Sequence, residues 1–179
     1  MELNKDVLIY EYLNYLYVIQ RSEQGTTKRN NTYQHASESV ALYSKIEKDC
    51  SYDRIGIDVF AALENYNKVL PKYEPWELSQ LNNQLRTWLG ARGIRTIIRE
   101  GKLVQVIEEN SKIEVIPFDN YNRNQWWGPM TKAMGFYEDK SVILENCTPE
   151  LLGRNIINAF NVATYNPNKR VFTDNKHCT

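Results

Sequence analysis

The clearest feature of the sequence is a pattern of apolar and polar residues that occurs twice. Residues 44–67 (SKIEKDCSYDRIGIDVFAALENYN) and 141–164 (SVILENCTPELLGRNIINAFNVAT) align without a gap at an offset of 97 residues, which is 141 minus 44. The identical positions are Ser44, Ile46, Cys50, Gly56 and Ala62 in the first copy and Ser141, Ile143, Cys147, Gly153 and Ala159 in the second. Because the matches follow helical spacing, the pattern indicates a repeated structural element.

Each copy predicts a strand, a sharp turn and a helix. Ser51 or Thr148 provides the hydroxyl that accepts from free amides of the first helical turn. Pro149 follows at the first helical position, where its missing N–H costs nothing. Asp53 and Glu150 place negative charge at the positive end of the helix dipole.

An apolar stripe runs along each predicted helix at four-residue spacing, as expected for a helix that covers a sheet. Its members are Ile55, Val59 and Leu63 in the first copy and Leu152, Ile156 and Phe160 in the second. Gly56 and Gly153 interrupt both helices at the same place, although glycine lowers helix propensity. We therefore expect that turn of each helix to pack closely against the sheet.

The segment between the copies predicts one more helix and several strands. Residues 75–89 have an amphipathic pattern that ends at Gly90, a typical C-cap. Residues 94–99, 103–108 and 112–118 read as an antiparallel meander, and residues 7–20 as one or two further strands. The prediction is a single α+β domain with a mixed, mainly antiparallel sheet flanked by about three helices.

Three segments are predicted to be irregular. Residues 24–37 are polar and read as a mobile surface loop, and residues 119–135 as a long loop rich in Asn and Trp. Residues 167–179 form a polar tail that we expect to be flexible.

Composition and charge exclude several classes of protein. Apolar residues make up 42% and charged residues 25%, and the formal net charge is zero, so no global field attracts nucleic acid or an anionic membrane. The first residues resemble neither a secretory signal nor a transit peptide, and we expect a cytoplasmic protein without a membrane span. The 12 Tyr and 4 Trp suit either a protein interface or a tyrosine-rich sheet.

The cysteine and histidine residues of the sequence give little support for a catalytic site. Cys50 and Cys147 precede helix N-termini, where a thiol can become reactive, but their equivalence in the repeat favours small apolar residues in the same packing niche. His35 and His177 lie in the polar loop and the tail, and the spacing of Cys50, Cys147 and Cys178 argues against zinc. We expect no enzymatic activity, cofactor, metal or small-molecule substrate.

Acidic and aromatic residues are better candidates for function, because an excess of carboxylates suits a basic partner. The alternative is a solvated sheet face with scattered charges. Two adjacent indoles also stand in the predicted long loop. The predicted partner-binding residues are Glu108, Glu109, Asp119, Tyr121, Trp126, Trp127, Glu138 and Asp139.

The two strand-turn-helix copies flank an antiparallel section that ends in Ile116-Pro117, and this arrangement resembles the CdiI immunity proteins of contact-dependent growth inhibition in Gram-negative bacteria. The resemblance covers residues 12–163 approximately. It implies a protein that binds the C-terminal toxin domain of a large surface protein, CdiA, and blocks its active site. Similar members are associated with ribonuclease toxins, whose phosphate-binding surface would attract carboxylates.

Two alternatives remain at this stage. A nucleic-acid-binding or regulatory module could stack bases on Trp126 and Trp127 beside Arg123, although the neutral net charge counts against it. An enzyme is the third possibility, and replacing both Cys50 and Cys147 by Ala should leave function intact if the cysteines only pack. Neither membrane nor nucleic acid is an expected partner.

Overall fold

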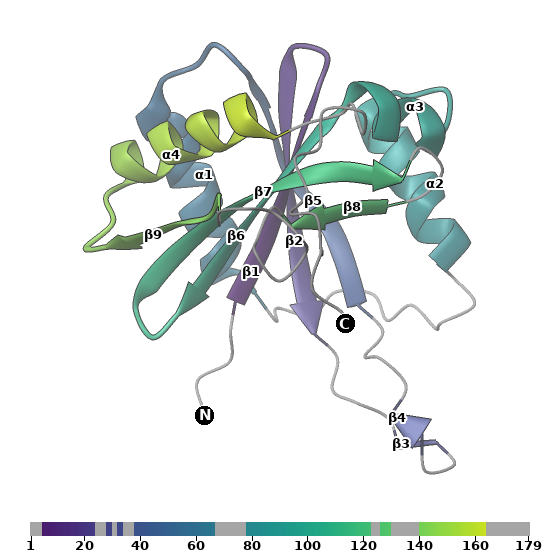
Figure 1. Ribbon diagram of the computed structural model, residues 1–179, viewed down its shortest axis with the longest axis horizontal. Coiled ribbons are helices and arrows are strands. Elements are labelled where there is room, and N and C mark those ends of the chain that lie inside the picture. The colour runs from purple at the N-terminus through teal and green to yellow at the C-terminus, as the bar shows by residue number, and fades with distance from the viewer. Residues whose placement is uncertain are drawn as a thin grey trace, which may run out of the picture.

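The structure is a computed structural model that describes residues 5–23, 28–29, 32–33, 38–66, 78–122, 126–129 and 140–163. The described strands are β1 (Lys5–Tyr12), β2 (Tyr15–Glu23), β3 (Lys28–Arg29), β4 (Thr32–Tyr33), β5 (Glu38–Glu47), β6 (Lys102–Glu109), β7 (Lys112–Asn122), β8 (Trp126–Pro129) and β9 (Val142–Glu145). The described helices are α1 (Tyr52–Glu64), α2 (Leu78–Leu89), α3 (Ile94–Glu100) and α4 (Pro149–Val162) (Figure 1).

The main sheet has the strand order β5-β2-β1-β6-β7-β8, and β9 pairs with β7 beside β8. Every strand pairing in the described residues is antiparallel. The predicted α+β class with a mainly antiparallel sheet is therefore confirmed. The strands expected within residues 7–20 are β1 and β2, which form a hairpin around the two-residue turn Leu13-Asn14.

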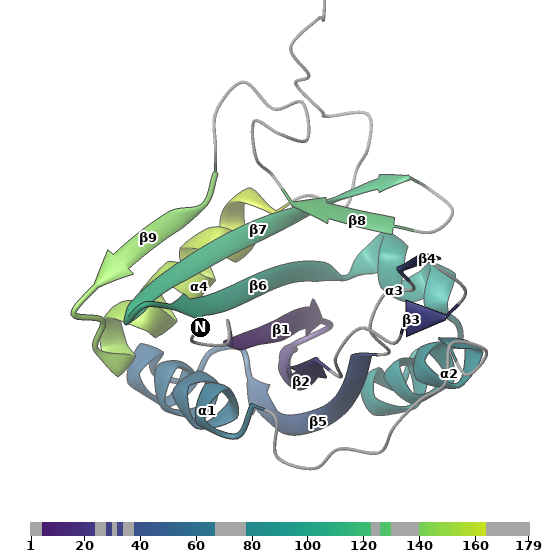
Figure 2. The ribbon, with the colours of Figure 1, turned by 90° about the horizontal axis from the view of Figure 1, so that it is seen from below.

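Helices cover both faces of this sheet (Figure 2). On one face the apolar stripes of α1 and α4 pack against alternate residues of the central strands, among them Val7, Val18 and Val104. The intervening residues, such as Tyr10, Tyr17 and Leu103, point to the other face and pack against α2 and α3. The side-chain alternation of the strands thus gives the sheet two apolar faces and the protein two cores.

Both strand-turn-helix copies are present, as β5-α1 and β9-α4. The hydroxyl of Ser51 accepts from the Arg54 amide at 3.3 Å, and that of Thr148 accepts from the Leu151 amide at 3.2 Å. Pro149 begins α4 as predicted. The helix starts were therefore readable from the sequence alone.

Each of the two glycines of the repeat packs against the helix of the other copy. The prediction that they pack against the sheet was wrong. A Cβ added at Gly56 would overlap the Pro149 carbonyl of α4, and one added at Gly153 would overlap the Tyr52 carbonyl of α1. Glycine is required here because two helix backbones touch.

Residues 94–99 form helix α3, and the prediction of a strand for them was wrong. Ile97 and Ile98 are buried, and Gly101 closes the helix by donating to the Ile97 carbonyl. Ile94, Ile97 and Ile98 have the i, i+3, i+4 spacing of a helix, whereas strand alternation fits only Ile94 and Ile98. In the structure Ile97 packs against the tyrosine face of the sheet. The described helices consequently number four.

The predicted long loop over residues 119–135 also contains regular structure. Strand β7 continues to Asn122, and residues 126–129 form β8, which pairs back onto β7. Within residues 24–37 the described parts are β3 and β4, a short antiparallel pair. The predicted helix over 75–89 is described from Leu78, and Gly90 ends it with a φ of 66°. The predicted tail, 167–179, lies outside the described residues.

Candidate partner-binding surface

The described acidic residues of the predicted partner-binding set are Glu108, Glu109 and Asp119, and they are dispersed. Glu108 and Glu109 lie next to the β6–β7 turn, and Glu108 pairs with Lys5 at 3.0 Å. Asp119 lies near the other end of β7 and is fully buried, so its carboxylate is not on the surface. Only Glu109 of these three acids is both exposed and without an ion pair in the part of the chain that the structure describes. These three described acids therefore do not lie together on one exposed acidic surface.

The aromatic members of the prediction belong to the β7–β8 pair. Tyr121 lies in β7, and Trp126 and Trp127 begin β8, with Trp126 opposite Asn122. Glu138 and Asp139 lie outside the described residues. Partner binding by these residues stays a prediction.

A different concave surface is visible where the first strand-turn-helix copy meets α4. One part of it, about 530 Å³, is lined by the β5–α1 turn, the first turn of α1 and two residues of α4. A second part of about 590 Å³ adjoins it at Lys48 and Asp49 and extends to the β1–β2 hairpin. The two parts lie on either side of the β5–α1 turn, because Ile157 packs against the core that contains α1 and α4 and Tyr15 against the core that contains α2 and α3. We call both parts together the turn-end groove, lined by Asn14, Tyr15, Glu47, Lys48, Asp49, Cys50, Ser51, Tyr52, Asp53, Glu150 and Ile157.

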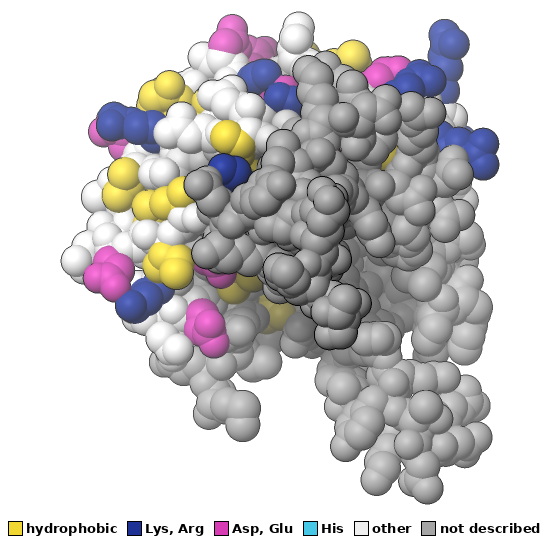
Figure 3. Space-filling model, in the orientation of Figure 1, with side chains coloured by type: hydrophobic (Ala, Val, Ile, Leu, Met, Phe, Trp, Pro, Cys, Tyr) yellow, Lys and Arg dark blue, Asp and Glu magenta, His cyan; other side chains and the backbone are white. Residues whose placement is uncertain are grey.

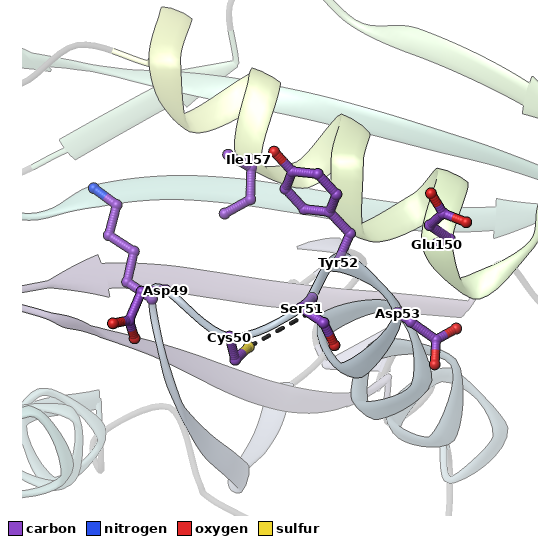
Figure 4. A pocket seen from close by; sticks show the side chains of 8 residues that line it. Asp49, Cys50, Ser51, Tyr52, Asp53, Glu150 and Ile157 are labelled. Carbon is purple, nitrogen blue, oxygen red and sulfur yellow. Dashed lines mark hydrogen bonds between the residues drawn. The ribbon is translucent and has the colours of Figure 1, made fainter.

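The side chains of the groove combine an aromatic ring with carboxylates. Figure 4 shows Tyr52 lying between α1 and α4, with Asp53 and Glu150 to one side and Asp49 to the other. Tyr52 is 43% exposed, and the guanidinium of Arg154 lies 5.9 Å from its ring. The groove thus combines exposed apolar surface, that of Tyr52, with carboxylates, and protein-binding sites likewise combine apolar surface with polar groups around it.

Acidic side chains outnumber basic ones in the lining of the groove by four to one. Lys48 is the one lysine or arginine among the lining residues, and its amine bonds to Glu11 at 2.7 Å. Glu150 pairs with Arg154, also at 2.7 Å. The other acids of the lining, Glu47, Asp49 and Asp53, are exposed and form no ion pair within the described residues. These three carboxylates are available to a basic partner.

An exposed leucine stands beside the groove. Leu13 is 67% exposed at the tip of the β1–β2 hairpin and has a φ of 56°. A positive φ at the first central residue of a two-residue hairpin is the pattern of a type II′ turn, where glycine is usual. A left-handed backbone costs a residue other than glycine about 1–2 kcal/mol. Leu13 is therefore unusual in two respects: a leucine occupies a turn position that favours glycine, and its large apolar side chain is exposed to solvent.

Sequence reasoning missed this groove. Its acids are spread over residues 47–53 and 150 and alternate with lysine and arginine, so the local sequence reads as neutral. The signal that could have pointed to it is Leu13-Asn14 in a hairpin turn where Asn-Gly or Gly is expected.

Elsewhere the exposed apolar side chains are scattered. Figure 3 shows them in small groups between charged and polar side chains over the part of the surface that carries β9 and α4. Val142, Ile143 and Val162 are 43%, 63% and 44% exposed. Such scattered apolar residues are normal on a protein surface and do not by themselves mark a site.

The two cysteines of the repeat are half-buried and pack against the core beneath α1 and α4, as predicted. Each thiol donates to the carbonyl of the following residue at 3.6 Å. Burial raises the pKa of the Cys50 thiol, partly offset by the nearby Arg54, and burial also raises the pKa of Cys147. A raised pKa disfavours the thiolate, which is the form that acts as a nucleophile.

Within the described residues, no group of three acidic, histidine or cysteine side chains comes together in a way that could hold a metal ion. None of the described helices is long and apolar enough to cross a membrane.

Fold and groove together define a single-domain α+β protein with a duplicated strand-turn-helix unit. Its architecture is similar to that of one chain in the CdiA-CT/CdiI toxin and immunity complex from Yersinia pseudotuberculosis. That likeness has a TM-score of 0.66 at 14% identity and covers 91% of this chain and 99% of the other. A protein of unknown function from Neisseria meningitidis, NMB0488, is similar with a TM-score of 0.61 at 15% identity, over 92% of this chain and 98% of that one. No protein-family model and no curated protein matches the sequence.

Proposed function

We propose that this chain is an immunity protein, which binds and neutralises the C-terminal toxin domain of a contact-dependent growth inhibition protein. The observation that carries the proposal is the likeness to a chain of the CdiA-CT/CdiI complex, because it spans nearly all of both chains. The duplicated strand-turn-helix unit is a second, independent support, because the resemblance of the sequence to this class rests on it. The chain would act by binding its partner and not by catalysis.

The finer part of the proposal concerns the toxin. The resemblance of the sequence implies a ribonuclease toxin whose active site is covered by the immunity protein. A nuclease must present positive charge to bind phosphates, and three unpaired carboxylates in the turn-end groove are suited to such a surface.

The test is to produce the toxin domain encoded directly upstream of this chain and to express it with and without the chain. We expect growth arrest by the toxin alone, rescue by the chain, and a one-to-one complex of nanomolar affinity. The isolated toxin is then given RNA and DNA separately. Cleavage of RNA that stops at equimolar chain supports the ribonuclease proposal, whereas cleavage of DNA alone contradicts it and leaves immunity intact.

Failure of rescue together with absence of binding would overturn the immunity function itself. A salt-dependent mobility shift of single-stranded RNA by the chain alone would instead support the nucleic-acid-binding alternative, in which Trp126 and Trp127 stack on bases.

A further inference from the structure

The β5–α1 turn, which lines the turn-end groove, and the tip of the β1–β2 hairpin lie at the same end of the sheet (Figure 1). The Lys48 amide donates to the Asn14 carbonyl at 2.9 Å, which ties the β5–α1 turn to the β1–β2 hairpin. The close contact of Gly56 with Pro149 holds α4 against α1 on the other side. The described walls of the groove are thus fixed by backbone contacts, and a partner would meet a surface that is already formed.

Resting on the proposed function, we propose that the turn-end groove is the surface that binds the toxin domain, and that Leu13 is an apolar anchor beside it. The occupant is a basic stretch of the toxin, rich in lysine or arginine, with an apolar pocket next to it that receives Leu13. This assignment differs from the one based on sequence, which placed the interface on residues 108–139.

The excess of negative charge in the groove favours a basic partner. Glu47, Asp49 and Asp53 are exposed and lack ion pairs in the described part of the chain, while Lys48 is engaged by Glu11. With a formal net charge of zero, the protein has no global attraction for a cation, so a local acidic surface must provide the steering. A toxin that binds phosphates offers the complementary charge.

Leu13 provides an exposed apolar side chain beside these carboxylates. Glycine at this position would remove the backbone strain and a polar residue would remove the exposed apolar surface, yet the chain has leucine there. Departures from local rules of this kind occur where a residue serves binding. Tyr52, also exposed, provides a second apolar contact within the groove itself.

The first experiment compares two charge reversals of equal size. The double variant E47K/D49K changes the groove, and the matched control E109K/E114K changes the β6–β7 hairpin that sequence analysis favoured. Association with the purified toxin domain is measured by stopped flow at several salt concentrations. We expect E47K/D49K to lower the association rate constant about tenfold at low salt and to flatten its salt dependence, while the control stays close to wild type.

The second experiment removes the anchor without damage to the turn. In Leu13→Gly the strained backbone is relieved, so the melting temperature should equal or exceed that of wild type. The dissociation constant for the toxin should nevertheless rise about tenfold or more. Leu13→Asn, which also tolerates a positive φ, should behave alike. Ile143→Thr is the control, since Ile143 is exposed to a similar extent on β9.

The outcomes separate this inference from the proposed function. If wild type fails to bind or neutralise the toxin, the proposed function fails. If wild type binds and both E47K/D49K and L13G bind equally well, the groove is overturned and immunity stands. A loss of binding in E109K/E114K or I143T alone would also overturn the groove and place the interface on the β7 side of the sheet.

Discussion

Gly56 of α1 lies directly against the backbone carbonyl of Pro149 at the start of α4, and the same contact recurs with the copies exchanged, because Gly153 lies against the carbonyl of Tyr52. Tyr52 and Pro149 stand at equivalent positions of the repeat, as do Gly56 and Gly153. The two helices therefore cross around an approximate two-fold axis. One sequence element, used twice, provides both halves of its own interface.

Alanine at either glycine should destabilise the protein. In an unhindered helix Gly→Ala would stabilise by about 1 kcal/mol, but here the added methyl meets a backbone that cannot move aside. We expect Gly56→Ala and Gly153→Ala each to lower the free energy of unfolding by about 1–3 kcal/mol in urea denaturation. Asn158→Ala, at an exposed position of α4, is the control and should be neutral or slightly stabilising. An increase in stability for either glycine variant would contradict the close crossing.

The caps of the two copies should contribute equally. Ser51→Ala and Thr148→Ala each remove a hydroxyl that accepts from an amide of the first helical turn. The expected loss is about 1 kcal/mol per site in thermal or chemical unfolding. Ser51→Asp retains an acceptor and should restore most of the stability. Equal losses in S51A and S51D would show that packing and not the cap accounts for the effect.

Much of this fold could be predicted because its signals are local. The caps Ser51 and Thr148, Pro149 and the four-residue apolar stripes are read from a few neighbouring residues. Helix α3 was missed because three isoleucines and a threonine in seven residues favour a strand by residue type, although Ile94, Ile97 and Ile98 have helical spacing. The packing partner of Gly56 was also hidden, because the repeat shows that glycine is needed but not which backbone approaches it.

The candidate site was harder to predict because charge pairing is a property of the folded chain. Lys48 and the acids beside it read as a balanced run until Glu11, 37 residues away, is seen to engage Lys48. Conversely, Glu108 reads as a free acid until Lys5 is placed opposite it across the β1–β6 pair. The sequence gives the number of charged residues, but the register of the sheet determines which of them form ion pairs within the protein and which can still bind a partner.

The thiols of Cys50 and Cys147 should be alkylated slowly at neutral pH, and their alkylation should become fast only at high pH. Burial raises both pKa values, so the half-maximal pH of iodoacetamide alkylation should lie above that of a free cysteine. In the unfolded chain these thiols ionise at lower pH than in the folded one. Stability is therefore fully present below the ordinary thiol pKa and declines as pH rises through the folded values. The measurement uses a Cys178→Ser background, and rapid alkylation at neutral pH would contradict the packing role.

Lys102 should stabilise the end of α4. Its amine donates to the carbonyl of Phe160 at 2.8 Å, in the last helical turn, where carbonyls lack a partner within the helix and carry the negative end of the dipole. Lys102→Met keeps most of the aliphatic stem and removes the donor, and we expect it to lower the free energy of unfolding by about 1 kcal/mol. Amide exchange in the last turn of α4 should accelerate with it, because that turn loses its tie to β6. Lys102→Arg retains a donor and should recover part of the loss. If K102M has the same free energy of unfolding and the same amide exchange as wild type, the contact between Lys102 and Phe160 has no stabilising role.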